Sequence, residues 1–143
     1  MFPSLFISHG SPMLALEPGE SGPALARLAA EMPRPRAIVI VSAHWESQEL
    51  LVNANPQPET WHDFGGFPAA LFAVQYPAVG LPELSGEVVA LLNAAGLPAK
   101  TTTQRPFDHG VWVPLSSMFP NADIPIVQIS LPTRAGPALQ TRV

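Results

Sequence analysis

The residues at positions 37–42 (AIVIVS) constrain the fold most, because they form an apolar, largely β-branched run that ends only at a serine. A run that is apolar on both faces is typical of a central strand buried between two layers. Upstream, Gly22 to Met32 predicts a helix, with Pro23 at its first position and Pro33 just after its end. Ser4 to Ser8 predicts a further strand. We therefore expect a strand–helix–strand unit at the start of the chain.

The rest of the chain alternates in the same way. A helix is predicted at Leu84 to Ala95, with Gly96 at its C-terminal stop, and a short helix is predicted to begin around Pro114. Further strands are predicted at 49–53, 99–103 and 126–130. The chain has 18 prolines, which are scattered and not repeated, so irregular loops should join these elements. We expect one α/β domain over residues 1–143, with a mixed or largely parallel sheet flanked by helices.

Composition and charge exclude several classes of protein. Hydrophobic residues make up 47% of the chain and charged residues 13%, which excludes wholesale disorder. Seven basic residues against eleven acidic ones give a net charge of -4, with no basic cluster, so nucleic acid is not an expected partner. The longest apolar run is far shorter than the roughly 20 residues that a membrane-spanning helix needs. We expect no membrane association.

The N-terminus and the absence of cysteine bear on location and on metal chemistry. The first ten residues, MFPSLFISHG, lack a basic region, and Pro3 and His9 interrupt the apolar stretch that a signal peptide would need. We therefore expect a cytoplasmic protein. Without cysteine, disulfides, thiolate zinc sites and iron–sulfur clusters are excluded. Any metal must be held by histidine and carboxylate side chains.

The chain has four histidines, His9, His44, His62 and His109, and two of them occupy equivalent places. His9 and His44 each follow a predicted strand, so both should lie at carboxyl ends of strands, where α/β proteins bind ligands. Imidazole suits iron, zinc and related divalent metals. The alternative for any single histidine is that it caps a turn or fills a polar gap in the core.

The residues beside these histidines support a site but have simpler roles as well. Ser11 offers a hydroxyl next to His9, and Trp45 offers an aromatic wall next to His44, although a tryptophan there can also cover the core. Asp108 places a carboxylate beside His109 in a predicted loop, where a histidine can act as an acid or base. The alternative is an Asp turn that starts the next helix.

Five motifs follow one another over nearly the whole chain: SHGSPM (8–13), SAHWE (42–46), HDFGGFP (62–68), YPAVGLPEL (76–84) and DHGVWVPLSSMFP (108–120). In this order they resemble the class III extradiol ring-cleavage dioxygenases, and most closely their DOPA-dioxygenase-like branch.

The resemblance implies an aromatic ring-opening dioxygenase that acts on a catechol-type substrate with O2, in the metabolism of aromatic compounds. It implies that His9 and His44 are metal ligands and that His109 is catalytic. Fe(II) is expected for turnover, and Zn(II) can occupy such a site. His62 stands where many relatives have tyrosine. The expected substrate pocket comprises Ser11, Trp45, His62, Asp63, Phe64 and Asp108; for Asp63 and Phe64 the alternative is a Gly-Gly turn with a packed phenylalanine.

In one respect the sequence departs from the family. Full-length relatives are nearly twice as long, and their second half supplies the third metal ligand and a further catalytic histidine, whereas no histidine follows His109 here. We therefore expect residues 1–143 to be the N-terminal portion of the catalytic domain, truncated relative to the family, with the C-terminal portion absent. The alternatives are an inactive remnant that binds metal or aromatics weakly and, with less support, a zinc-dependent hydrolase. The sequence determines neither the catechol nor the oligomeric state.

Overall fold

The computed structural model describes residues 2–133 of the chain and has the alternating α/β architecture that the sequence predicts. Its elements, in chain order, are the 3-10 helix η1 (Pro12–Ala15), α1 (Ser21–Glu31), β1 (Ile38–Ser47), β2 (Leu50–Asn53), α2 (Ala69–Phe72), α3 (Pro82–Ala94), β3 (Ala99–Thr102), α4 (His109–Met118) and β4 (Ile126–Pro132).

The four strands form one mixed sheet in the order β1-β4-β2-β3. β1 pairs parallel with β4, and β2 pairs parallel with β3. The two parallel pairs are joined by an antiparallel contact between β2 and β4, in which Val52 lies opposite Ile129. The predicted mixed or largely parallel sheet is therefore confirmed.

The interior strands of the sheet are β4 and β2 and not β1, so the prediction of a central strand at residues 37–42 is wrong in this respect. β4 is buried along almost its whole length. β1 is an edge strand of the described sheet, and its Val39 and Val41 side chains are 50% and 43% exposed. An apolar run shows that a strand prefers burial, but its place in the sheet depends on strands that pair with it from elsewhere in the chain.

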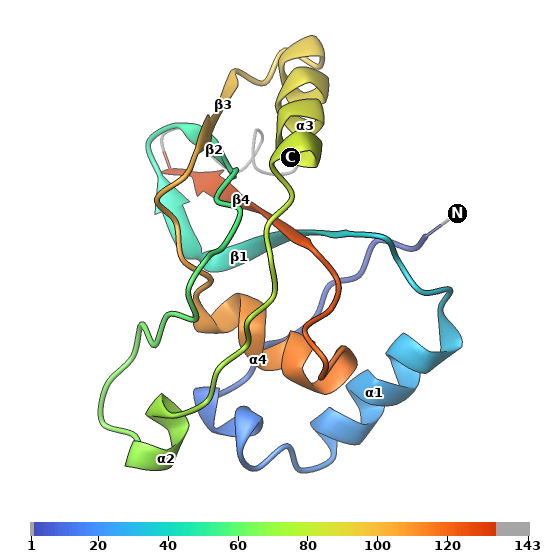
Figure 1. The fold of residues 1–143 in the computed structure, drawn as a ribbon, viewed down its shortest axis with the longest axis vertical. Coiled ribbons are helices and arrows are strands. Elements are labelled where there is room, and N and C mark those ends of the chain that lie inside the picture. Colours follow the sequence, from blue (N-terminus) through green and yellow to red (C-terminus); the bar gives the residue numbers. More distant parts are fainter. Residues whose placement is uncertain (1, 134–143) are drawn as a thin grey trace.

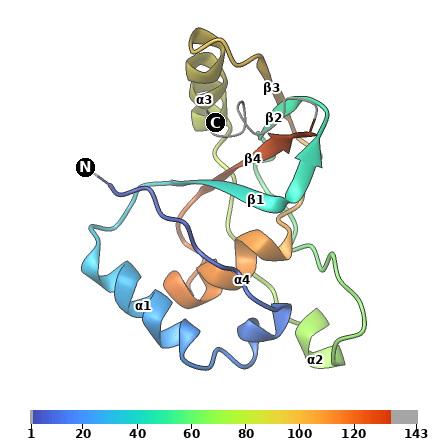
Figure 2. The same cartoon turned by 180° about the vertical axis from the view of Figure 1, so that it is seen from behind.

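Helices pack on both sides of the sheet (Figures 1 and 2). α4 lies against β1, and α1 packs on α4, so these two helices and η1 enclose the larger apolar core. α3 covers β2 and β3 on the other side and encloses a second, smaller core. No helix within residues 2–133 is long and apolar enough to cross a membrane.

The helix that carries the DHG motif begins earlier than predicted. α4 starts at His109, and Pro114 lies inside it. The Asp108 side chain accepts a hydrogen bond from the Gly110 backbone N–H at 3.0 Å and thereby caps the first turn. The motif is therefore a helix start, as in the alternative of an Asp turn, and not a loop.

The strand predicted at Ser4 to Ser8 is absent from the described structure. Ile7 packs against the larger core, while the Leu5 and Phe6 side chains are exposed. Side-chain packing and not a β-ladder therefore holds this segment. His9 consequently follows a segment without regular secondary structure and not the end of a strand.

Candidate metal centre

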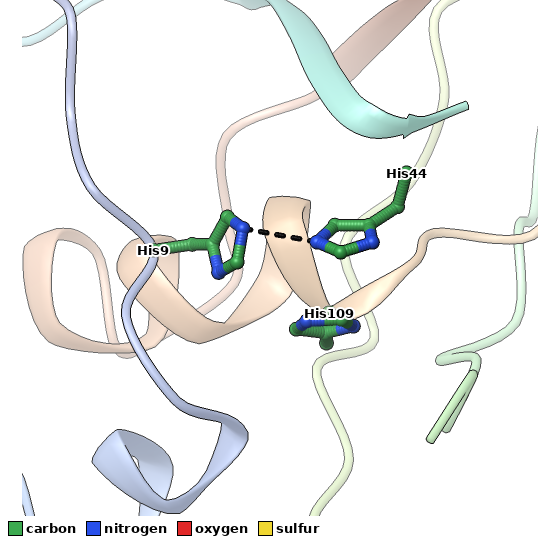
Figure 3. A group of neighbouring side chains, drawn as sticks. All are labelled: His9, His44 and His109. Carbon is green, nitrogen blue, oxygen red and sulfur yellow. Dashed lines mark hydrogen bonds between the residues drawn. The ribbon is translucent and has the colours of Figure 1, made fainter. Parts of the chain in front are cut away.

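Three histidines from separate parts of the chain come together at one point (Figure 3). His9 lies just before η1, His44 lies in β1, and His109 is the first residue of α4. Their candidate ligand nitrogens all lie within 4.8 Å of one another. The Nε2 atoms of His9 and His44 are 2.9 Å apart.

The turn after His9 fixes the orientation of its ring. The Nδ1 atom of His9 lies 2.8 Å from the Gly10 carbonyl oxygen, which can only accept, so Nδ1 carries the proton. Nε2 of the neutral ring therefore keeps its lone pair and faces His44. Gly10 has a φ of 61°, which favours glycine, and a Cβ there would collide with Leu14. The next residue, Ser11, caps η1 by accepting a hydrogen bond from the Met13 N–H at 3.3 Å.

His44 lies where β1 leaves its regular pairing. The register of β1 against β4 shifts between Val41 and Glu46, so His44 belongs to an irregular part of the strand, which is a common way to aim a side chain at a site. Partial burial lowers the pKa of His44, and the nearby His109 and His9 lower it further. The neutral imidazole, which is the form that binds metals, is thereby favoured.

His109 is held by a carboxylate from another loop. Asp63 Oδ1 accepts hydrogen bonds from the His109 backbone N–H at 3.0 Å and from its ring Nδ1 at 2.8 Å. Burial acts to raise the pKa of Asp63, but the hydrogen bonds from His109 outweigh it, and the pKa lies below its usual value. Because Nδ1 is occupied, Nε2 is the ring atom of His109 that remains for a metal or for proton transfer.

The first turn of α4 lies directly against β1. A Cβ on Gly110 would lie 2.9 Å from His44 Cδ2 and 3.1 Å from Asp108 Oδ1, and closer still to Ser42 Oγ. No residue with a side chain fits there without a shift of its neighbours. Glycine at this position therefore allows His44 and His109 to approach each other, and their ring centroids are 4.0 Å apart.

The spacing of one pair of nitrogens, those of His9 and His44, fits a divalent metal ion. Metal–nitrogen bonds of about 2.0 to 2.1 Å place neighbouring ligand nitrogens roughly 2.9 to 3.4 Å apart. The 2.9 Å between His9 Nε2 and His44 Nε2 agrees with this range. An all-imidazole donor set suits zinc and iron among other metals, so the donors do not by themselves choose between them.

The predicted pocket residues take different places. Asp63 and Phe64 contact His109, with 5.5 Å between the ring centroids of Phe64 and His109. His62 donates from Nε2 to the Val74 carbonyl at 3.0 Å and packs on Phe64, outside the three-histidine group. The other predicted residues have structural contacts: Ser11 caps η1, Asp108 caps α4, and Trp45 is buried against Arg105.

Sequence reasoning missed the residues that surround the Asp108 carboxylate. Asp108 is fully buried and accepts hydrogen bonds from Ser42 Oγ at 2.6 Å, Gln128 Nε2 at 2.7 Å and Arg105 Nη2 at 2.8 Å. The available signal was Arg105 itself, three positions before an aspartate in a chain with few charges. Ser42 and Gln128 lie in predicted strands and gave no such signal.

Fold and site together define a mixed α/β domain with a candidate metal centre at the edge of its sheet. Residues 3–142 match the family described as "Catalytic LigB subunit of aromatic ring-opening dioxygenase". The chain belongs to this family, as its motifs predict.

Individual relatives agree with this assignment. The chain is 47% identical over 130 residues to the 4,5-DOPA dioxygenase extradiol of Escherichia coli, a match that covers 90% of this chain and 47% of the relative. It is 40% identical to the protein of the same name from Beta vulgaris, over 90% of this chain and 49% of the relative. The chain thus spans about half the length of these curated relatives.

A solved structure shares the fold. The crystal structure of an uncharacterised protein from Escherichia coli K12 superimposes with a TM-score of 0.61 at 37% identity. The match covers 79% of this chain and 41% of the other one.

Proposed function

We propose that this chain takes part in the extradiol cleavage of a catechol-type ring by O2, at a non-haem Fe(II) held by His9 and His44. The carrying observation is that these two histidines and His109 converge within 4.8 Å in a chain whose relatives are named 4,5-DOPA dioxygenase extradiol. Zn(II) is the metal that would most readily occupy the same nitrogens without redox chemistry.

His9 and His44 hold the metal in this proposal. His9 presents Nε2 because its Nδ1 is bound to the Gly10 carbonyl, and the lowered pKa of His44 keeps that ring neutral. A divalent iron bound there would supply open coordination positions for the catechol oxygens and for O2. Both atoms of O2 enter the product, so the catechol itself supplies the electrons and no further reductant is needed.

His109 acts as the acid and base. Its Nε2 accepts a proton from a catechol hydroxyl and later returns it to the oxygen from which the ring-opened product forms. Asp63 fixes the ring through Nδ1 and stabilises the imidazolium while it carries that proton. Phe64 stands beside His109 as an aromatic wall for the substrate ring, and His62 packs behind Phe64.

The same proposal covers the organisation of the chain. Residues 1–143 make up the N-terminal portion of the ring-cleavage domain, which agrees with the half-length match to the curated relatives. We also propose that the protein is cytoplasmic and that its substrate is a small catechol. It has neither a nucleic-acid partner nor a membrane partner in this proposal.

Metal content and oxygen uptake of the full chain test the proposal. The chain is loaded anaerobically with Fe(II), and oxygen uptake is followed with catechol and with DOPA. His9→Ala and His44→Ala should each lose most of the bound iron and the uptake. His62→Gln is the matched control for metal content, because its ring lies outside the three-histidine group and its amide can still donate to Val74 O.

Each outcome bears on a separate part of the proposal. Iron binding that does not depend on His9 or His44 would overturn the ligand assignment. If the chain binds iron but takes up no O2 with either catechol, the proposed dioxygenase activity of the chain is overturned. That result would favour the alternative of an inactive remnant that binds metal or aromatics weakly. Hydrolysis of an ester or amide by the chain loaded with Zn(II) would favour the alternative of a zinc-dependent hydrolase.

A further inference from the structure

We propose that Arg105 is a positioning residue of the metal centre, which holds His44 and His109 in place by binding the His44 carbonyl and the Asp108 carboxylate at the same time. This inference rests on the proposed function. It adds a residue that lies outside the three-histidine group and acts through its neighbours.

One nitrogen of Arg105 joins the two elements that carry these histidines. Arg105 lies in the loop between β3 and α4. Its Nη2 donates to the His44 backbone carbonyl at 2.9 Å and to Asp108 Oδ2 at 2.8 Å. Asp108 directly precedes His109 and caps its helix. The guanidinium therefore ties the backbone of one histidine to the residue next to the other.

Two tryptophans hold the guanidinium in place. Its central carbon lies 5.2 Å from the Trp45 ring centroid and 4.8 Å from the Trp61 ring centroid. The Arg105 side chain is only 15% exposed. A planar cation stacks on aromatic rings in a way that a lysine ammonium does not reproduce, so the arginine is specifically suited to this place.

The charge of Arg105 also balances a buried anion. The Asp108 side chain has no exposed surface, and a buried carboxylate is costly unless it is paired and hydrogen-bonded. Ser42 from β1 and Gln128 from β4 bind the same carboxylate. Asp108 thus connects the sheet with the start of α4, and Arg105 supplies the positive charge at this junction.

The geometry predicts how the loss of Arg105 acts on the metal centre. The backbone carbonyl of His44 lies in the irregular part of β1, where the pairing with β4 is interrupted. Arg105 provides a bond to the backbone at this point. Without it, the position of the His44 ring is less well defined relative to His9 and His109, and metal affinity falls. Removing a group that orients metal ligands typically costs about 10- to 100-fold in affinity.

Four variants of the full chain separate positioning from stability. Arg105→Met removes the charge and the hydrogen bonds but leaves Asp108 as an unpaired buried anion. The double variant Arg105→Met/Asp108→Asn removes both charges; Gln128 Oε1 has no partner within the described residues, so a flipped Gln128 amide can accept from Asn. Arg105→Lys keeps the charge. Arg34→Met is the matched control, because Arg34 forms an exposed ion pair with Asp123.

The readouts are the dissociation constant for Zn(II), the visible spectrum of the Co(II) form, and folding by circular dichroism. We expect Zn(II) affinity to fall about 10- to 100-fold in Arg105→Met and in the folded double variant. The Co(II) spectrum should change with it. Arg105→Lys should recover part of the loss, and Arg34→Met should bind like the unchanged chain.

The outcomes distinguish this inference from the proposed function. A folded double variant with the Zn(II) affinity and Co(II) spectrum of the unchanged chain would overturn the positioning role of Arg105. The proposed function would not be affected by that result. If the double variant does not fold, Arg105→Lys decides by the same two readouts, and full retention of both overturns the inference. An unchanged chain that binds neither metal overturns the proposed function and this inference with it.

Discussion

Asp63 and His109 form a carboxylate–imidazole pair in which one oxygen, Oδ1, accepts both the backbone N–H and the ring Nδ1–H of the histidine. The two residues are 46 positions apart in the sequence. The pair fixes the ring, leaves Nε2 outside this contact and satisfies an N–H at the start of α4, which would otherwise lack an intrahelical partner. The same contact therefore caps the helix start and orients the His109 ring.

Replacing Asp63 with Asn should weaken both the start of α4 and the fixed position of the His109 ring. We expect Asp63→Asn to lower the free energy of unfolding by about 1.5 to 3 kcal/mol at pH 7, because both hydrogen bonds from His109 lose the charge of their acceptor. The pKa of Asp63 is lower in the folded chain than in the unfolded one, so this stabilisation is present at neutral pH and is lost as the pH falls below about 4. Urea unfolding at pH 7 and pH 3 measures the difference, which should shrink at pH 3. An equal difference at both pH values would contradict the charged role of Asp63.

Gly110→Ala should disturb the approach of α4 to His44. The added Cβ would lie 2.9 Å from His44 Cδ2, so β1 and α4 must separate. We expect a loss of about 1 to 3 kcal/mol in urea unfolding and weaker Zn(II) binding. Gly86→Ala is the matched control, because it lies in α3 and its Cβ would meet nothing within 4 Å. The control should raise stability by about 0.5 to 1 kcal/mol, and similar effects of both changes would refute the close approach.

His109→Gln should separate proton transfer from metal binding. If His109 acts as the acid and base, the variant keeps most of its Fe(II) when loaded anaerobically and loses most of its oxygen uptake with catechol. Metal analysis and an oxygen electrode on the same sample give both values. A loss of iron equal to that in His44→Ala would instead make His109 a third ligand, in line with its place in the three-histidine group.

Tyr76→Phe should change the alkaline stability of the larger core. The Tyr76 hydroxyl donates to the Phe119 carbonyl at 2.9 Å, so its loss should cost about 1 kcal/mol at pH 8. Burial, together with nearby Asp123, raises the pKa of Tyr76 to about 12. Between pH 10 and 12 the unfolded tyrosine ionises first, so the unchanged chain loses stability there and the variant does not. The urea midpoints of the two chains should converge above pH 10 and reverse their order by pH 11.5, and a constant gap would contradict this prediction.

The elements of the fold were largely predictable because their signals are local. The helix at Gly22 to Met32 and the strand at 126–130 are each predicted from a run of adjacent residues. The structure contains both, with small changes of boundary. The place of a strand in the sheet is not local. The residues at 37–42 are more uniformly apolar than β4, yet β4 lies inside the sheet and β1 at its edge, because β1 and β2 both pair with β4.

The helix start at His109 shows a second limit of local reasoning. Pro114 is a strong signal for a first turn, but the Asp108 side chain caps the helix earlier, and the surrounding hydrogen bonds hold Asp108 in that position. A proline inside a helix is tolerated where the rest of the helix is fixed by tertiary contacts. α4 meets this condition, since seven of its ten residues, Pro114 among them, are buried.

By itself the sequence determined the alternating elements, the family and the identity of the histidines, because residue type and order along the chain carry that information directly. Only the tertiary structure decided which side chains meet. His9 and His44 are 35 positions apart, and His44 and Arg105 are 61 apart. Such contacts depend on how the strands pair and how closely α4 packs on β1, which no single segment encodes. The contact of Asp63 with His109 and the place of Arg105 beside the three-histidine group follow from that packing.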